Sequence, residues 1–208
     1  MHTLFAARGW GSVIVEAAFA YSGVPYRLDY VTMDGSDSSL ERLRSFNPLG
    51  QLPTVITPDG SIMTESAAII LHLADSAPTT AGLAPPAGAA SRPAFLRWLI
   101  FIVAAIYPTF TTGDYPERYV DGEAAQQAFV DRILDLRKSL WLQVEEAAGA
   151  PYFLGAECSA VDIYIWAMRH WRPRAAWFAE HCPKLTAIGA VMDGDERLAL
   201  IKAQNWPT

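Results

Sequence analysis

The chain has 208 residues, of which 51% are hydrophobic, so it can form one large domain or two small ones around a substantial core. Its formal charge is -6 at neutral pH, and its 16 Lys and Arg residues form no basic run. Nucleic acids and anionic membranes attract clustered positive charge. The charge balance therefore argues against both partners and favours a small molecule or a protein.

The first residues do not combine a basic segment with a long apolar stretch, so we expect no signal peptide and a cytoplasmic protein. The most apolar stretch, Trp98–Tyr107, is shorter than a bilayer span and is interpreted as a buried core helix. Cys158 and Cys182 are the only cysteines, and with the four histidines they form no metal-ligand pattern. We expect neither a disulfide framework nor a bound metal.

The first third of the chain begins with alternating strand and helix patterns. A short apolar strand over Thr3–Ala7 is followed by a glycine-containing turn and a helix, with Ser12 as the expected N-cap and Gly23 at its C-terminal end. Alternation over Tyr26–Val31 predicts a second strand. A short helix ending at Arg44 follows. This order is typical of a βαβ unit.

The next segment predicts a hairpin and a further helix. Strand-like residues at Thr54–Thr57 and Ser61–Met63 flank Pro58–Gly60, whose residues suit a tight turn. A helix with one apolar face begins near Thr64 to Ser66. Together the elements predict an α/β thioredoxin-like N-terminal domain over residues 1–77, with helices on the faces of a small mixed sheet.

The composition changes at Ser76–Pro93, which is rich in Ala, Pro, Gly and Thr and shows no sustained period. We assign residues 78–92 to a linker and residues 93–208 to an all-α C-terminal helical bundle. Ser159 and Asp162 have the spacing of a capping box at the start of a helix. The clearest helical patterns of this region cover Ala94–Thr112, Gly122–Ala148 and Ala160–Trp171.

Two short motifs of the first domain indicate a peptide-binding site. A proline that directly precedes a strand cannot donate to the ladder, and a cis Leu52-Pro53 bond exposes the Leu52 backbone to an extended peptide. Glu65 and Ser66 open a helix whose free amides favour a carboxylate, and Glu65 can pair with an ammonium group. Each motif alone also has a structural interpretation, as a trans proline at a strand start and as a plain helix cap.

Together these motifs, NPLGQLP and PDGSIMTESAAIILHLAD, resemble the glutathione-binding half of the cytosolic glutathione transferases, as do the segments SGVPY and FLGAECSAVDIYIW elsewhere in the chain. The resemblance is to bacterial-type members with serine at the activating position, and it assigns no class. It implies glutathione as co-substrate, no metal and a homodimer. Leu52 beside Pro53 would pair with the cysteine backbone of glutathione, Glu65 and Ser66 would hold its γ-glutamyl end, and Gln51 would make a minor contact.

The resemblance also places the residue that activates the glutathione thiol at Ser12. A free thiol with a pKa of about 8.5 is mostly protonated at neutral pH, so a hydrogen-bond donor and a helix N-terminus must favour the thiolate. Ser12 would supply the hydroxyl. Alternatively Ser12 is only an N-cap, and Trp10, Arg8 or the Gly11 amide stabilises the thiolate. No cysteine precedes Cys158, which argues against the branch of the family that uses a catalytic cysteine.

The expected function is conjugation of the glutathione thiolate to an apolar electrophile bound in a pocket between the two domains. Trp10, Tyr107, Phe110 and Tyr115 are the candidates for that pocket, although aromatic residues at helical spacing are also typical of ordinary core packing. The alternative function is a non-catalytic glutathione-transferase-like binding or assembly module.

Overall fold

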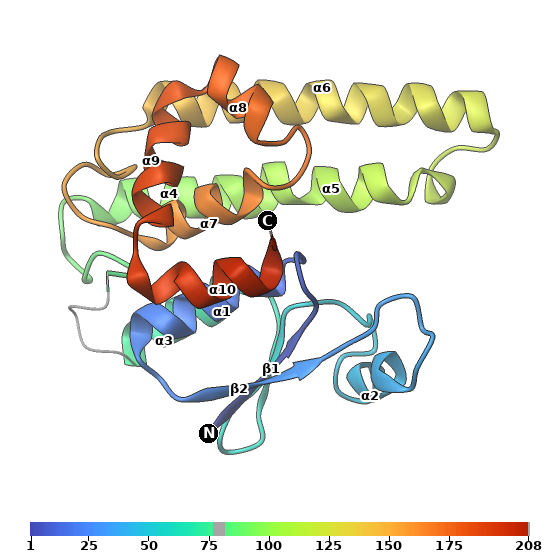
Figure 1. Cartoon of the computed structure of the whole chain (residues 1–208), viewed down its shortest axis with the longest axis horizontal. Coiled ribbons are helices and arrows are strands. Elements are labelled where there is room, and N and C mark those ends of the chain that lie inside the picture. Colours follow the sequence, from blue (N-terminus) through green and yellow to red (C-terminus); the bar gives the residue numbers. More distant parts are fainter. Residues whose placement is uncertain (77–81, 208) are drawn as a thin grey trace. The chain divides into compact units, whose positions relative to one another are not determined.

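The computed structural model describes residues 1–76 and 82–207 and divides the chain into two compact units (Figure 1). The first unit combines Met1–Pro86 with Met192–Thr208, and the helical unit is Ala87–Val191. This division differs from the expected domains at the C-terminus, because the last segment packs with the first unit. Residues 77–81, at the end of the expected first domain and the start of the expected linker, lie outside the described residues.

The first unit contains a four-stranded mixed sheet with the order β2-β1-β3-β4. Strand β1 pairs in parallel with β2, and β3 pairs antiparallel with both β1 and β4. The predicted order βαβ, helix, ββα and the thioredoxin-like fold are confirmed. The elements of this unit are β1 (His2–Ala6), α1 (Ser12–Ser22), β2 (Tyr26–Tyr30), α2 (Ser39–Phe46), β3 (Thr54–Ile56), β4 (Ile62–Met63), α3 (Ser66–Ser76) and α10 (Glu196–Asn205).

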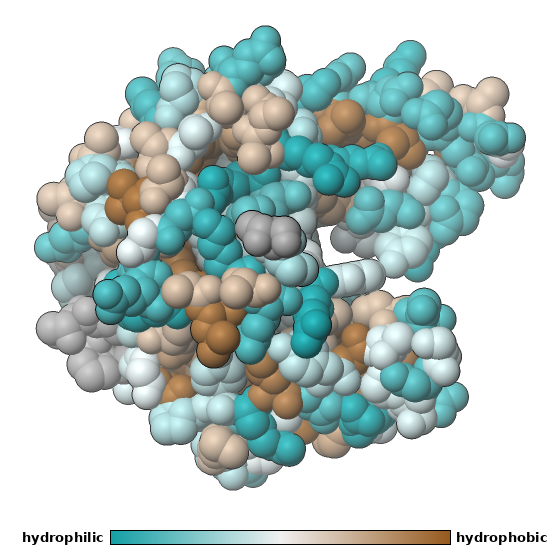
Figure 2. All heavy atoms as spheres, viewed as in Figure 1, coloured by the Kyte–Doolittle hydropathy of each residue, from teal (hydrophilic) through white to brown (hydrophobic). Residues whose placement is uncertain are grey.

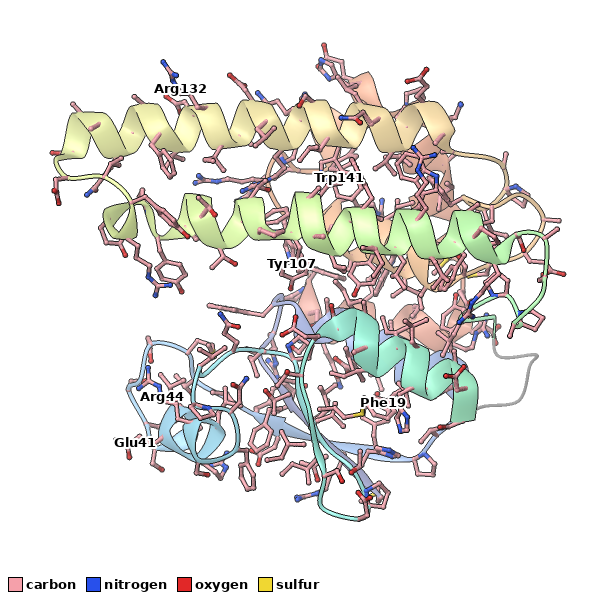
Figure 3. The ribbon with its side chains drawn as sticks, turned by 180° about the vertical axis from the view of Figure 1, so that it is seen from behind. Phe19, Glu41, Arg44, Tyr107, Arg132 and Trp141 are labelled. Carbon is pink, nitrogen blue, oxygen red and sulfur yellow. The ribbon has the colours of Figure 1, made fainter. Side chains whose placement is uncertain are left out.

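Helices cover both faces of this sheet. Phe5 of β1 packs in a buried cluster with Leu43 of α2, and side chains alternate along a strand, so the neighbouring Leu4 points to the other face. Helices α1 and α3 pack against each other on that face (Figure 1). Phe19 of α1 is almost fully buried and stacks on Tyr26 of β2 with ring centres 4.7 Å apart (Figure 3). The core therefore fixes α1 firmly against the sheet.

The helical unit is built on two long helical segments. Helices α4, η2 and α5 form one continuous helix, which lies alongside α6 (Figure 1). Trp141 of α6 is fully buried and packs edge-on against Phe178 (Figure 3). The predicted all-α character is confirmed. The elements are α4 (Arg92–Phe101), η2 (Ile102–Ile106, a π-helix), α5 (Tyr107–Asp114), η3 (Pro116–Arg118), α6 (Glu123–Ala147), α7 (Ala160–Met168), α8 (Ala175–His181) and α9 (Pro183–Asp193), whose last residues belong to the first unit.

The predicted capping box is present at the start of α7, which is buried along its whole length. Asp162 accepts hydrogen bonds from the Ser159 amide at 2.8 Å and from the Phe153 amide at 2.7 Å. The carboxylate thus satisfies donors of both the helix end and the preceding loop, which ties the loop to the core helix.

The continuous helix Arg92–Asp114 extends the predicted helix Ala94–Thr112 by two residues at each end. In the described part of the chain it is the one helix that is long and apolar enough to cross a membrane, a test that core helices also pass. The fully buried side chains Phe95, Leu99, Ile102 and Ile106 recur on one of its faces. Hydrophilic side chains cover most of the exposed surface of the neighbouring α6 (Figure 2). Of the most apolar 18-residue window of the helix Arg92–Asp114, 39% is buried.

Candidate functional site

The strand register brings three loop segments to one end of the sheet. Phe5 pairs with Thr54, and Val55 pairs with Met63. Continued beyond these pairs, the register places Ala7, which follows β1, opposite Leu52, and it places Leu52 in turn opposite the start of α3. The loop after β1, the Leu52-Pro53 peptide and the residues that open α3 are therefore neighbours, although they are far apart in the sequence.

The segment before β3 presents the backbone of Leu52. The Leu52-Pro53 bond is cis, as expected. The buried Asn47 donates through Nδ2 to the Gln51 carbonyl at 3.2 Å and to the Thr54 hydroxyl at 3.0 Å, which fixes the loop on both sides of Leu52. The side chain of Leu52 packs on the cluster around Phe5. Within the described residues its amide and carbonyl have no hydrogen-bond partner, so both are open to a ligand.

The start of α3 combines a buried serine with an unusual backbone conformation at the preceding residue. Ser66 is the first residue of α3 and is buried, whereas Glu65 is exposed. Glu65 has φ 64°, a left-handed conformation that costs a residue other than glycine about 1 kcal/mol or more. Such conformations concentrate at ligand-binding positions. The sequence carried no signal for this feature.

The loop between β1 and α1 is held by Ser12, in a way that the sequence analysis did not predict. The N-cap of α1 is Gly11, and Ser12 is its first residue. The Ser12 hydroxyl is buried, accepts a hydrogen bond from the Ala7 amide at 3.1 Å and donates to the Ala7 carbonyl at 3.2 Å. Its single proton is therefore used within the loop. The amides of Gly11 and Ser12 donate to no residue in the described ranges.

The other residues considered for this loop point outward. Trp10 is 44% exposed. The guanidinium carbon of Arg8 lies 5.6 Å from the ring centre of Tyr30, as in a cation–π contact. The side chains of Trp10 and Arg8 are therefore both exposed on the surface of this loop.

The candidate pocket residues of the helical unit fall into two groups. Tyr107 and Phe110 pack with Trp171, with ring centres 5.3 to 6.3 Å apart, directly after the π-helix η2 (Figure 3). Tyr115 is separate and carries the Arg118 guanidinium 4.1 Å from its ring centre. π-Helical turns are frequent at functional sites because they rotate the side chains that follow.

The buried Arg137, which the sequence analysis did not identify, packs against this aromatic group. Arg137 donates to the Thr109 carbonyl at 2.6 Å and to the Thr109 hydroxyl at 2.9 Å, and its guanidinium carbon lies 3.7 Å from the ring centre of Phe110. Burial lowers the pKa of Arg137 to about 10, so it stays charged at neutral pH. Arg137 thereby fixes the orientation of Phe110.

Comparison with known proteins identifies the family. The family model of the glutathione S-transferase N-terminal domain matches residues 12–76. The GST-like protein YncG of Escherichia coli strain K12, itself described as uncharacterised, is 38% identical over 190 residues, which cover 90% of each chain. The chain belongs to the glutathione S-transferase family. The glutathione S-transferase GstA of Escherichia coli O157:H7 is 31% identical over 174 residues, or 81% of each chain.

Solved structures of this glutathione S-transferase family share the fold. A Sulfitobacter glutathione transferase homologue, crystallised with bound glutathione, has a TM-score of 0.86 at 22% identity and covers 97% of both chains. The bacterial glutathione S-transferase BphK, solved as a ternary complex, has a TM-score of 0.74 at 26% identity over 96% of both chains. In the described residues of the present chain, no cluster of His, Cys, Asp or Glu side chains is suited to a metal ion.

Glu16, one turn into α1 and almost fully buried, makes the stability of the first unit depend on pH. Burial raises its pKa from 4.5 to about 6, although a hydrogen bond from Asn205 partly opposes the shift. The folded state therefore holds this proton more tightly than the unfolded state. The contribution of Glu16 to stability is fully present below pH 4.5 and is lost as the pH rises through 6.

We predict that Glu16→Gln removes this pH dependence. Relative to the wild type, the free energy of unfolding of the variant should rise by about 2 kcal/mol between acid and neutral pH, measured by urea denaturation. Glu41→Gln on the exposed side of α2 is the control and should show no such change. A constant difference between Glu16→Gln and the wild type would contradict the assignment.

Proposed function

We propose that this protein is a glutathione transferase that binds glutathione at the end of the sheet where Leu52, Ser66 and the loop after β1 meet. The unpaired backbone of Leu52 carries the proposal, because it offers a donor and an acceptor to an extended peptide in the manner of an added strand. The Ser66 end of α3 offers amides to a carboxylate, and the exposed Glu65 offers a charge to an ammonium group. Gln51, also exposed, is a further contact from the same loop.

The dimensions of this sheet end support a tripeptide ligand. From β1 across β3 to β4 is two strand spacings, or about 10 Å. Three extended residues span about the same length. With the γ-glutamyl end at α3 and the cysteine beside Leu52, the sulfur would lie near the loop that ends at Ser12, because the register places Leu52 opposite Ala7. This is the geometry that a reaction at the thiol requires.

In this arrangement the donors to the sulfur are the amides of Gly11 and Ser12 at the positive end of α1. The hydroxyl of Ser12, which the sequence analysis assigned to this task, supports them by closing the loop onto Ala7. A thiolate held by two amides is the nucleophile that attacks an electrophilic carbon. The thiolate forms a carbon–sulfur bond as the leaving group departs with its bonding electrons, or it adds to the carbon and the resulting anion takes up a proton from water.

The proposed electrophile is apolar, since Tyr107, Phe110 and Trp171 form an aromatic group in the helical unit. The guanidinium of Arg137 packs on the ring of Phe110 and is itself held by hydrogen bonds to Thr109. Trp10 and Tyr115 stay candidates for additional contacts. Aromatic faces suit flat or extended apolar compounds better than charged ones.

We predict that Glu65→Gln weakens glutathione binding about tenfold to a hundredfold, because it removes a charged hydrogen bond while keeping the shape of the side chain. Isothermal titration with glutathione measures the change. Glu41→Gln, an equally exposed position on α2, should bind as the wild type does. Equal affinity of Glu65→Gln and the wild type would remove Glu65 from the site.

We predict that Ser12→Ala retains part of the ultraviolet thiolate absorbance that appears when glutathione binds, because the amides of Gly11 and Ser12 remain. Complete loss of the absorbance, with amide NMR signals of residues 7–11 unchanged, would assign the donor to the Ser12 hydroxyl instead. Glutathione binding by the wild type without any thiolate absorbance would favour the alternative function, a non-catalytic binding or assembly module.

We also propose, on family membership, that the protein acts in the cytoplasm as a two-fold symmetric homodimer. Sedimentation equilibrium should then give twice the mass of the 22.8 kDa chain. A single species of monomer mass across the accessible concentration range would exclude the dimer.

A further inference from the structure

The C-terminal helix α10 belongs to the first unit and packs along α1, the helix that begins at the proposed thiolate site (Figure 1). Contacts to α1 or to the loop before it lie at both ends of α10. At the start of α10, Asp195 accepts a hydrogen bond from the Tyr21 hydroxyl at 2.6 Å, and the Arg197 guanidinium carbon lies 3.7 Å from the centre of the Tyr21 ring. This end is attached to the last turn of α1, far along the chain from Ser12.

At its other end α10 reaches the loop between β1 and α1 through Asn205. The buried Asn205 accepts a hydrogen bond on Oδ1 from the Gly9 amide at 2.9 Å. Its Nδ2 donates to the Ile201 carbonyl at 2.9 Å and to the Glu16 carboxylate at 3.4 Å. Gly9 has φ 74°, a conformation that favours glycine, and a Cβ there would lie 3.6 Å from the Asn205 carbonyl.

The chemistry of these contacts requires an amide at position 205. Asn205 accepts from Gly9 and donates to Ile201 and Glu16, and a side-chain amide provides an acceptor oxygen and two N–H donors at the same time. An aspartate would keep the bond from Gly9 but would bring a second carboxylate against Glu16. An apolar residue would remove the hydrogen bond that Asn205 accepts from the Gly9 amide.

The loop Ala7–Gly11 is therefore fixed from two sides. Ser12 closes it from within, through two hydrogen bonds to Ala7. Asn205 fixes its middle from outside, through Gly9. The Gly11 and Ser12 amides lie two and three residues after Gly9, so their direction depends on both contacts.

We propose that Asn205 is a positioning residue for thiolate stabilisation: its side-chain amide holds the loop so that the Gly11 and Ser12 amides point at the glutathione sulfur. The inference rests on the proposed function, since it assumes that glutathione binds beside this loop. Asn205 itself does not touch the sulfur. Catalysis at the first third of the chain thus depends on a residue from the last helix.

The test compares Asn205→Ala with Tyr21→Phe in the full-length protein. Tyr21→Phe loosens α10 at its other end, leaves Gly9 untouched and serves as the matched control. Asn205→Leu, which also removes the acceptor for Gly9 but fills more of the buried space, is a second variant in case the alanine variant does not fold. The measurements are amide hydrogen exchange of Gly9 without glutathione, the affinity for glutathione, and the apparent thiol pKa of bound glutathione from its ultraviolet thiolate absorbance.

We expect Asn205→Ala to speed exchange at Gly9 about fivefold to tenfold. The thiol pKa of bound glutathione should rise by about half to one unit, so that about threefold to tenfold less thiolate forms at neutral pH. Glutathione affinity should change less than twofold, because Leu52, Glu65 and Ser66 are unaffected. Tyr21→Phe should lower the melting temperature but leave both Gly9 exchange and the thiol pKa unchanged.

The outcomes separate this inference from the proposed function. An unchanged thiol pKa in both Asn205 variants, with thiolate formed in the wild type, overturns the positioning role and leaves the proposed function standing. An equal rise of the thiol pKa in Tyr21→Phe overturns it too, because general loosening of α10 then explains the effect. Absence of thiolate in the wild type overturns both.

Discussion

The site depends on the antiparallel pairing of β3 with its two neighbours. Because β3 is antiparallel to both β1 and β4, the last residue of β1, the first residue of β3 and the last residue of β4 lie at the same end of the sheet. A shift of this register by one residue would turn the side chains of Leu52 and Thr54 together to the other face of the sheet and would break the contact of Asn47 with Thr54. The buried cluster of Phe5, Val31 and Leu43 resists such a shift.

At this end of the sheet, backbone groups supply more of the proposed ligand contacts than side chains do. Leu52 offers its amide and carbonyl, and the loop before α1 offers the amides of Gly11 and Ser12. The polar side chains nearby mostly act on the protein itself: Asn47 braces the Leu52 loop, and Ser12 closes the loop onto Ala7. Backbone groups carry no titratable charge, so the site presents directed dipoles that need no proton of their own.

The sequence was sufficient for features that depend on local patterns. The strands, the helices, the Pro53 motif, the Ser66 helix start and the Ser159–Asp162 capping box follow from periodicity and turn chemistry. Features that depend on contacts between residues far apart in the sequence could not be predicted from the sequence. The left-handed Glu65, the capture of the Ser12 hydroxyl by Ala7 and the roles of Arg137 and Asn205 each require knowing which segments meet in space.

The assignment of α10 to the first unit has a consequence for the order of synthesis. The helical unit is encoded by one uninterrupted stretch, Ala87–Val191, whereas the first unit takes its pieces from both termini. During translation the helical unit is complete while the site-bearing unit still lacks its closing helix. The first unit begins first and is finished last, so a chain cut short after Val191 would carry every proposed ligand contact in the first unit and still lack the helix that holds the loop before α1.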